Sequence, residues 1–404
     1  MSKRVLFELI GVAAVVIAVL GLLTLTRTPV AGRSPALTGK GGPAPRTAWG
    51  DADLQGIWTD EHETPLQRPA RYAGREFFTD AEIAQLDKQR AGLLGREYRD
   101  KDAEGKATEQ DVAGAYNAVF ESHKHTGRRT SLVVDPPDGI IPPLTLEAQK
   151  KRATYRAFQV ALLQATETCK IRAPSCTDGK YGPPSPRRGE APPIYNTDRL
   201  NRADGPEDRS LTERCLGAAL PDFGGYRRIV QSPGAVSIFY DVGQGQGWQR
   251  LIPIDASPHL PSSIHERFGD SRGRWEGNTL VVDVTNFGPN TDFRGSNEHL
   301  HLIERWTRTD ASTLEYAVTI DDPTTWTKPW TVKHEMAKQD EQANRFYMEP
   351  RCHEGNYGMV GMLSDTRAME RAFAKGRGPD PATRDIALAG AGGGEDNQDP
   401  LQGR

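Results

Sequence analysis

The sequence predicts a mainly β protein, with an antiparallel up-and-down barrel around which N-terminal helices and extended arms are wrapped. Three observations indicate this fold class. Apolar and polar residues alternate through residues 269–351, clusters of Gly, Asn, Asp and Pro interrupt the alternation, and the pieces between them have the length of short strands. This pattern is typical of consecutive hairpins with one covered face. A closed barrel would also remove exposed edge strands, whereas a two-layered sandwich, the alternative, would keep them.

The strand candidates define a barrel domain over residues 211–363. In chain order they fall at about 227–231, 235–241, 248–254, 272–277, 279–287, 299–308, 313–320, 330–337 and 345–350. The first hairpin is expected to turn at Ser232-Pro233-Gly234, since Pro and Gly favour tight turns. The covered face also carries polar side chains, which a pure packing core would avoid. We therefore expect the barrel to enclose a pocket for one small ligand.

Residues 49–210 predict a mixed helical and extended region that wraps the barrel. A short strand would carry Trp58 into the core. A helix is expected to begin at Thr79, because Glu82 stands at the position that completes a capping box. Apolar residues near helical spacing predict a second helix over residues 146–169.

The composition and the N-terminus limit the possible functions. The net charge is −3, from 51 basic and 54 acidic residues, which gives no reason to expect a nucleic-acid partner. Lys3 and Arg4 precede an apolar stretch that runs from Ile10 to Leu25. Residues 1–25 are therefore expected to be a signal peptide or an uncleaved inner-membrane anchor, with residues 6–25 in the bilayer. Either alternative exports the rest of the chain to the periplasm.

Two further segments are expected to lack fixed structure. Residues 26–48 are rich in Pro and Gly and are typical of a flexible linker. Residues 376–404 are rich in Gly, Asp and Pro and are typical of a disordered tail.

An exported protein can keep disulfides, and this chain has four cysteines. Cys169 and Cys176 are close enough to close a small loop, and Cys215 and Cys352 would then join the segment before the barrel to its last strand. Four cysteines allow three pairings, and free thiols are the alternative. Metal ligation is disfavoured because no Cys-x-x-Cys or His-x-x-His spacing occurs.

Several motifs resemble those of a widespread, uncharacterised family of exported bacterial proteins. The resemblance covers most of residues 54–363 and rests on LQGIW, RRTSLVVDPPDGIIPPLT, GRWEGNTLVV, LHLIERWTR and CHEGNYG. It implies export but no particular activity. The string from His265 to Arg267 departs from the family pattern. A more distant resemblance to lipocalin-like barrels rests on a Gly-x-Trp strand start.

The segment HLHLIERWT carries the densest group of ionisable residues. In a strand, one face would present His299, His301 and Arg305, and the other Glu304 and Trp306. Whichever face is covered, ionisable groups are buried and need partners. In the interior, Glu304 would suit a general acid or base. The alternative is an ion pair between Glu304 and Arg272 or Arg274 that only fixes barrel packing.

Two other segments carry candidate site residues. In GDSRGRWEGN, Arg272 suits recognition of an anionic group, and Trp275 follows it. In CHEGNYG, just past the last strand, His353 is a candidate proton shuttle that Glu354 would orient. Tyr357 adds a donor there. The alternative for this segment is a structural plug fixed by Cys352.

Single residues complete the candidate site. Asn286 and Arg294 are expected at the rim of the barrel, and His334 is expected to point inward. His259 lies in the rigid loop PHLP. His299 and His301, together with His353, could bind a metal, although no further ligand motif supports this.

These observations predict an exported, cofactor-independent acid–base enzyme: a lyase, isomerase, cyclase or hydrolase acting on an apolar or amphipathic small molecule. His301, Glu304 and His353 would move protons, and Arg272 or Arg305 would hold developing negative charge. The alternatives are a non-catalytic periplasmic carrier with the same pocket and a structural protein of the envelope.

Overall fold

The structure is a computed structural model. It describes residues 45–60, 62–93, 125–195, 198–217, 219–243, 246–339 and 352–387. The expected signal or anchor, most of the expected linker and the strand candidate at 345–350 lie outside these residues. Within the described residues, no helix combines the length and the apolar character needed to cross a bilayer.

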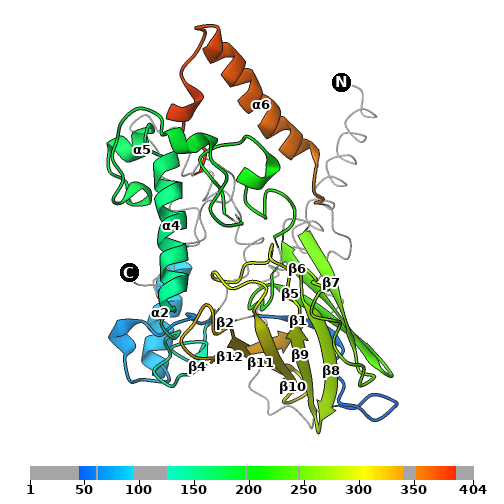
Figure 1. Cartoon of the computed structure of the whole chain (residues 1–404). Helices are drawn as coiled ribbons and strands as arrows, with labels where there is room; N and C mark the ends of the chain where they lie inside the picture. The colour runs from blue at the N-terminus through cyan, green and yellow to red at the C-terminus, as the bar shows by residue number, and fades with distance from the viewer. Residues whose placement is uncertain are drawn as a thin grey trace, which may run out of the picture. The chain divides into compact units, whose positions relative to one another are not determined.

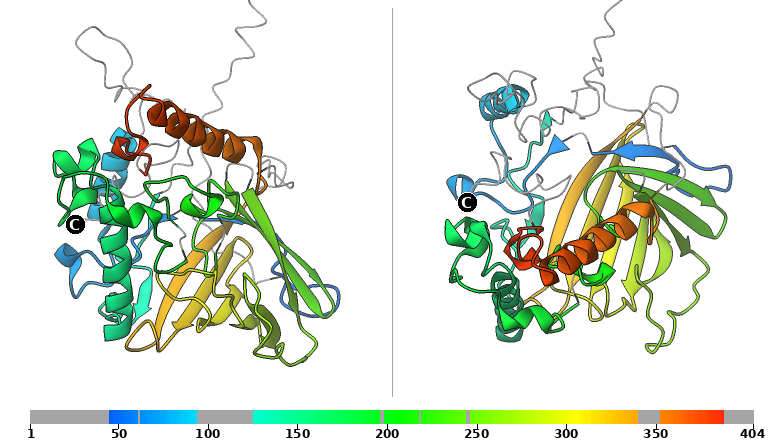
Figure 2. Two further views of the ribbon diagram at one scale, coloured as in Figure 1. Left: turned by 45° about the horizontal axis from the view of Figure 1, so that its top comes forward. Right: turned by 90° about the horizontal axis from the view of Figure 1, so that it is seen from above.

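Nine strands form one antiparallel path that curls into a nearly closed barrel (Figure 1, Figure 2). Their order in space is β7-β6-β5-β1-β12-β11-β10-β9-β8. Their bounds are Gly56–Thr59 (β1), Tyr226–Ser232 (β5), Ala235–Gly243 (β6), Gln246–Pro253 (β7), Asp270–Glu276 (β8), Thr279–Thr285 (β9), His301–Arg308 (β10), Thr313–Asp321 (β11) and Trp330–Lys338 (β12). The barrel and the up-and-down order of β5 to β12 were predicted; β1, which inserts between β5 and β12, brings the count to nine.

Side chains join the two ends of this path, β7 and β8. The side chain of Arg250 in β7 donates through Nε to Ser271 Oγ in β8, at 2.8 Å. Gly273 in β8 lies against Ile252 in β7: a Cβ on this glycine would come within 2.9 Å of the isoleucine side chain. The absence of a side chain at Gly273 therefore lets the two strands approach each other.

The interior of the barrel is packed with the inward side chains that the alternation predicts. In β11, for example, Leu314, Tyr316, Val318 and Ile320 are buried, and the residues between them are partly exposed. Three tryptophans are the largest fully buried side chains: Trp58, Trp306 and Trp330. Burying one large apolar side chain contributes about 1.5–3 kcal/mol, so these indoles are a major part of the stability of the barrel.

Among the described residues, four helices and several short elements accompany the barrel. The helices are α2 (Asp80–Leu93), α4 (Leu146–Leu162), α5 (Glu167–Lys170) and α6 (Tyr357–Ala374), and the 3-10 turns are η1 (Ala70–Tyr72), η3 (Pro174–Cys176), η4 (Pro186–Gly189), η5 (Pro206–Asp208) and η6 (Pro381–Thr383). A short strand, β4 (Val133–Asp135), pairs with β12, and β2 (His62–Glu63) pairs with β3 (His125–Thr126) in parallel.

The starts of the two predicted helices are confirmed by their capping contacts, but the second one, expected to reach residue 169, ends at Leu162. The backbone N–H of Thr79 donates to Glu82 Oε2 at 2.8 Å, and the N–H of Glu82 donates back to Thr79 Oγ1 at 3.3 Å. At the start of α4, Thr145 Oγ1 accepts from Ala148 N at 3.1 Å. Thr145 also donates to the carbonyl of Thr324, at 2.7 Å, so the β11–β12 connection holds the start of α4.

Both expected disulfides are present: Cys169 bonds to Cys176 and Cys215 bonds to Cys352. Two disulfides fit an exported protein or one from another oxidising compartment. The second bond joins the chain before β5 to the segment before α6, which are 137 residues apart in sequence.

The structure differs from the sequence analysis near the C-terminus. Helix α6 begins within the expected barrel domain, at Tyr357, and continues to Ala374 through residues for which no structure was predicted. The tail was expected to be disordered from residue 376, but residues 376–387 include η6, and the backbone N–H of Ile386 donates to Asn201 Oδ1 at 2.8 Å. Residues 376–387 contain few apolar side chains, and their fixed structure depends on contacts with segments distant in sequence. Local composition does not reveal such contacts.

Candidate functional site

The barrel interior holds a buried polar network around Glu304. Arg250 Nη1 lies 2.6 Å from Glu304 Oε2, and the hydroxyl of Tyr316 donates to Glu304 Oε1 at 2.7 Å. Arg250 also donates to Tyr240 at 3.4 Å, and to Ser271 as described above. Each of these side chains comes from a different strand, so the network connects β6, β7, β8, β10 and β11.

The electrostatics of this network keep Arg250 charged and the tyrosines neutral. Burial alone would lower the pKa of Arg250, but the charge of Glu304 and the interactions with Tyr240 together hold that pKa above its ordinary value. Burial raises the pKa of Tyr240 to about 12. Burial, reinforced by the charge of Glu304, raises the pKa of Tyr316 well above its ordinary value. Tyr316 therefore remains a hydrogen-bond donor to a carboxylate.

Glu304 has no exposed surface, and Arg250 is only 5% exposed. A substrate cannot touch Glu304 unless the barrel opens. The ion pair that the sequence analysis weighed for Glu304 is present, but its partner is Arg250 and not Arg272 or Arg274. Arg250 lies on β7, which is next to β8 where the two ends of the strand path meet. The sequence does not show that these two strands are neighbours.

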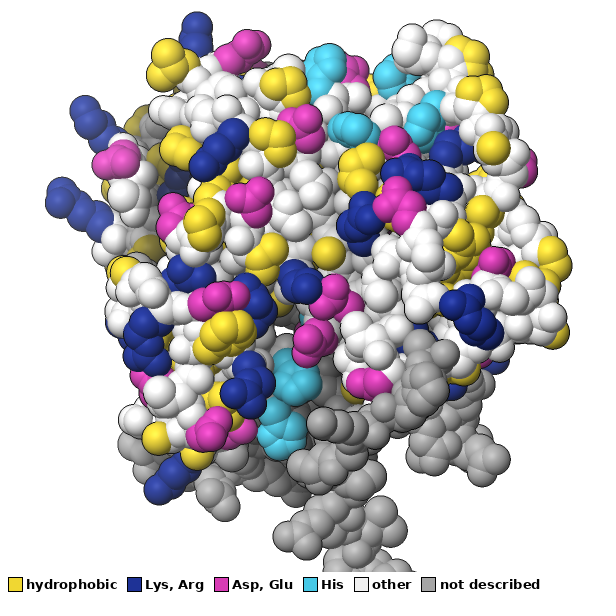
Figure 3. Space-filling view, turned by 90° about the horizontal axis from the view of Figure 1, so that it is seen from below, with side chains coloured by type: hydrophobic (Ala, Val, Ile, Leu, Met, Phe, Trp, Pro, Cys, Tyr) yellow, Lys and Arg dark blue, Asp and Glu magenta, His cyan; other side chains and the backbone are white. Residues whose placement is uncertain are grey.

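A second group, here called the outer-face chain, consists of Asp270, His259, Asp283 and His301. His259 Nδ1 lies 2.7 Å from Asp270 Oδ2, and its Nε2 lies 3.4 Å from Asp283 Oδ1. His301 Nε2 lies 2.9 Å from the same Asp283 oxygen. Figure 3 shows histidine side chains gathered beside acidic and basic ones on one part of the molecular surface.

Asp270 fixes the orientation of His259. Its carboxylate is buried and accepts from the backbone N–H of Leu260 at 3.0 Å, and it pairs with Arg272 at 2.9 Å. Because a carboxylate only accepts, His259 carries a proton on Nδ1. The imidazole is thus oriented with Nε2 directed toward a second carboxylate, that of Asp283.

Sequence reasoning did not find this chain as a unit. Asp283 received no role, and His259 was placed only in a rigid loop. The register of β9 against β10 pairs Asp283 with Ile303, which puts His301 at a diagonal position on the same face. The connection between β7 and β8 brings His259 to the same place, and no local pattern predicts how that long connection folds back.

The four predicted catalytic residues do not form one site. His301 and Glu304 lie on opposite faces of β10, as their spacing requires. Glu354 instead binds Arg214, with Oε1 2.7 Å from Nη2. His353 lies beside Glu354 in an exposed segment after Cys352.

Glu354 connects to a pocket through one further residue. Arg214 Nη1 donates to the hydroxyl of Tyr195 at 3.2 Å, and Tyr195 lines that pocket. Arg214 is buried, and the neighbouring Cys215 is bonded to Cys352, so the disulfide and the ion pair hold the same two segments together.

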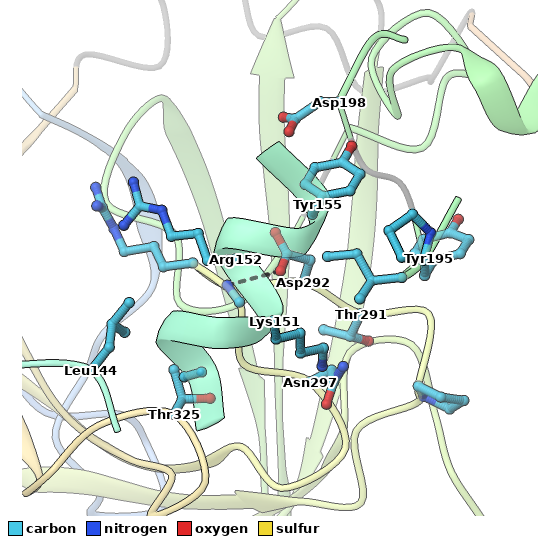
Figure 4. A pocket seen from close by; sticks show the side chains of 16 residues that line it. Leu144, Lys151, Arg152, Tyr155, Tyr195, Asp198, Thr291, Asp292, Asn297 and Thr325 are labelled. Carbon is cyan, nitrogen blue, oxygen red and sulfur yellow. Dashed lines mark hydrogen bonds between the residues drawn. The ribbon is translucent and has the colours of Figure 1, made fainter. Parts of the chain in front are cut away.

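This pocket, here called the α4 pocket, has a volume of about 500 Å³. Figure 4 shows its labelled side chains converging from four segments: α4 with Leu144 before it, the segment around Tyr195, the connection between β9 and β10, and Thr325 in the connection between β11 and β12. On α4 the lining residues are Ala148, Lys151, Arg152 and Tyr155. Their spacing of three, one and three residues places them on one face of the helix.

The β9–β10 connection forms a fixed wall of the α4 pocket. Buried Phe293 anchors it, and the backbone groups of Phe293 and Ser296 exchange hydrogen bonds at 2.8 and 3.0 Å. Ser296 itself is buried and donates to Asp322. The exposed tip between these anchors presents Arg294 to the pocket in a left-handed conformation, with φ +56°. Arg294 is the one predicted site residue that lines this pocket.

Tyr155 is the titratable group most affected by its position in the pocket wall. Burial, with the charges of Asp198 and Asp292, raises its pKa well above the ordinary value. Tyr155 therefore presents a neutral hydroxyl, which points toward Asp198 in Figure 4. Asp292 accepts from the backbone N–H of Gly295 at 2.9 Å.

The other predicted ligand-binding residues have structural surroundings. Asn286 donates to the carbonyls of Leu260, Pro261 and Ile264 and so holds the β7–β8 connection. His334 points inward as expected and pairs with buried Asp60 at 3.0 Å.

The remaining three also lie away from the α4 pocket. Trp275 is partly buried and packs against the barrel core. Arg305 is exposed and pairs with Glu276. Tyr357 starts α6 and is 95% exposed.

In the described part of the chain, no three His, Cys, Asp or Glu residues are arranged to hold a metal ion. No protein-family model matches the chain, and no curated protein matches it. The resemblance to a family of exported bacterial proteins therefore stays a prediction.

Proposed function

We propose that this protein is an exported binding or carrier protein that holds an amphipathic small molecule in the α4 pocket. Export would use residues 1–25 as a cleaved signal or as an anchor. The α4 pocket carries the proposal: its volume of about 500 Å³ lies within the range of small-molecule sites, roughly 300–1,000 Å³.

The chemistry of the lining supports the same conclusion. Leu144, Pro193 and Ile194 give the pocket an apolar part, and Tyr155 gives it an aromatic hydroxyl. Charged side chains from α4 and from the β9–β10 connection also line it. Such a mixture of apolar surface and a few placed polar groups is typical of sites for ligands with an apolar body and a polar end.

The proposal moves the ligand from the barrel interior to its outside. Inward side chains such as Leu302, Trp306 and Val318 have almost no exposed surface. A hollow large enough for water would leave part of their surface exposed. The interior therefore supports the walls of the pocket, while the connections around it contact the ligand.

Fluorescence titration with N-phenyl-1-naphthylamine tests this proposal. This neutral amphipathic probe brightens when it enters an apolar pocket, and we expect saturable binding of one molecule per chain. Ala148→Trp, which places an indole in the pocket, is expected to weaken binding at least about ten-fold. Lys150→Trp, an exposed position on the same helix that does not line the pocket, is the control. Equal binding by wild type and Ala148→Trp would refute the proposal.

A second candidate function, acid–base catalysis, is favoured by the outer-face chain. Asp270 orients His259 through Nδ1, and a histidine oriented by a carboxylate suits proton transfer through its other ring nitrogen. Hydrolysis of p-nitrophenyl acetate is the test, since it needs only a base to activate water. His259→Gln should slow hydrolysis at least about ten-fold relative to His299→Gln, which removes an exposed histidine near the same strand. Equal rates would remove this candidate.

A further inference from the structure

The charges on the wall of the α4 pocket indicate which ligands it prefers. Its acidic residues already have partners: Asp292 accepts from Gly295, and Asp198 Oδ2 accepts from Gln159 Nε2 at 3.5 Å. The carboxylates also face Tyr155, whose hydroxyl is neutral. Their demand for donors is therefore met in part by the protein itself.

The two basic residues of α4 differ from these carboxylates. Lys151 and Arg152 are exposed side chains that line the pocket, and none of the described carboxylates forms an ion pair with either of them. They are adjacent in sequence and stand one turn before Tyr155 on the same face. The wall thus offers two positive charges next to an apolar and aromatic surface.

Arg294 approaches from the opposite wall, on the anchored tip of the β9–β10 connection. Three cations therefore face the pocket against two carboxylates. The pocket wall thus carries one more positive than negative charge, which favours an anionic occupant over a neutral one of the same shape. An anionic group would satisfy it through charge-assisted hydrogen bonds.

We propose that the ligand of the α4 pocket is an amphipathic organic anion, whose carboxylate, sulfonate or phosphate group binds Lys151 and Arg152 while its apolar body lies against Tyr155 and Ile194. The proposal rests on the proposed function, because it assigns a ligand class to the same pocket. It excludes neutral lipids and sugars as preferred ligands.

Two fluorescent probes with the same aromatic body separate the two ideas. N-phenyl-1-naphthylamine is neutral, and 8-anilino-1-naphthalenesulfonate carries an added sulfonate. The wild-type protein should bind the sulfonate probe at least about ten-fold more tightly than the neutral one. The double variant Lys151→Gln, Arg152→Gln should abolish most of this preference. Each exposed ion pair contributes about five-fold at most, so the two pairs together can account for a ten-fold preference. Binding of the neutral probe should change less than about two-fold.

Lys150→Gln is the matched control, since it removes the same charge from the same helix outside the pocket lining. It should keep the preference for the sulfonate probe, and raising the salt concentration should reduce that preference in wild type. Saturable binding of the neutral probe, blocked by Ala148→Trp, with no preference for the sulfonate would overturn the anion proposal and leave the pocket standing. Failure of both probes to bind the pocket would overturn both proposals.

Discussion

The barrel interior and the α4 pocket use the same kinds of side chain in opposite ways. Inside the barrel, Arg250 and Glu304 neutralise each other, and two tyrosines occupy positions around them. On the pocket wall, Lys151 and Arg152 lack such a counter-charge among the described residues. The buried charges of this protein thus stabilise its architecture, whereas the proposed ligand recognition depends on charges that the fold leaves without an ion pair.

The largest expected effect comes from breaking the interior pair. Glu304→Ala should lower the free energy of unfolding by about 3–5 kcal/mol, because Arg250 would remain buried without its partner. Urea denaturation measures this change. Glu315→Ala on β11 is the control: Glu315 pairs with Lys333 at 2.7 Å on the partly exposed face, and its loss should cost less than about 1 kcal/mol.

A double variant tests whether the unpaired charge of Arg250 causes this loss of stability. Arg250→Met combined with Glu304→Leu removes both charges, and it should recover a large part of the stability lost in Glu304→Ala. If the single variant were as stable as wild type, Glu304 would be accessible to water and free to serve a ligand, contrary to the comparison.

The next largest effect is expected from alkaline pH, which should lower the free energy of unfolding through the buried tyrosines of the interior. The pKa of Tyr240 rises to about 12 in the folded protein, from an ordinary value near 10, and that of Tyr316 rises in the same direction. Above pH 10 the unfolded chain loses these protons while the folded chain keeps them. The free energy of unfolding therefore falls as the pH rises, by about 1.4 kcal/mol per unit and per tyrosine up to the folded pKa.

Urea denaturation at pH 9, 10 and 11 measures this slope. Tyr155 on the pocket wall contributes with the same sign. Tyr240→Phe is expected to reduce the slope by its own share, which isolates the interior contribution. A stability that stays constant from pH 9 to 11 would show that these hydroxyls are solvated in the folded state.

Substitutions in the outer-face chain should change the free energy of unfolding less than those in the barrel interior and more than those on the wall of the α4 pocket. Asp270 is buried but bonded to groups near the surface, so Asp270→Asn is expected to cost about 1.5–3 kcal/mol, the range for hydrogen bonds to a charged group. His301→Gln, at a position where the histidine side chain is 41% exposed, should cost less than about 1 kcal/mol. Thermal unfolding of both variants measures the ratio, and a larger effect for His301→Gln would contradict the assignment of Asp270 as the anchor of the chain.

The barrel could be predicted from the sequence because its signals are local. Alternation in TLEYAVTID determines which side of β11 is buried, and the turn residues between strands determine where each hairpin reverses. The insertion of β1 between β5 and β12 could not be predicted, because four residues with Trp58 do not specify their neighbours. Helix α6 was missed because the barrel domain was expected to extend to residue 363, whereas its last described strand, β12, ends at Lys338.

The candidate site was harder to predict than the fold. Opposite faces of β10 were assigned correctly to His301 and Glu304, but the covered face was expected to line a hollow. Packing of Trp306 and Tyr316 against each other, with ring centroids 4.2 Å apart, fills that space, and no sequence pattern reports how completely side chains fill a barrel. The α4 pocket joins four segments distant in sequence, and only Arg294 among its residues was singled out.

The smallest expected effect tests how the C-terminal segment supports the pocket. Glu354 holds Arg214, and Arg214 donates to the hydroxyl of Tyr195 in the pocket wall. Glu354→Gln keeps the shape of the side chain and weakens the first of these contacts, since a neutral amide oxygen is a poorer acceptor for a guanidinium. We expect the dissociation constant of N-phenyl-1-naphthylamine to rise about two-fold to five-fold, with little change in the free energy of unfolding.

Glu370→Gln is the matched control for this last prediction, because Glu370 lies on α6 and pairs with Arg367 at 3.2 Å on the surface. It should leave probe binding unchanged. A loss of affinity in both variants would assign the effect to the charge of the C-terminal segment as a whole. A loss in Glu354→Gln alone would mean that Arg214 couples the segment after Cys352 to Tyr195 in the pocket wall. The contact between Glu354 and Arg214 would then contribute to ligand binding although neither residue lines the pocket.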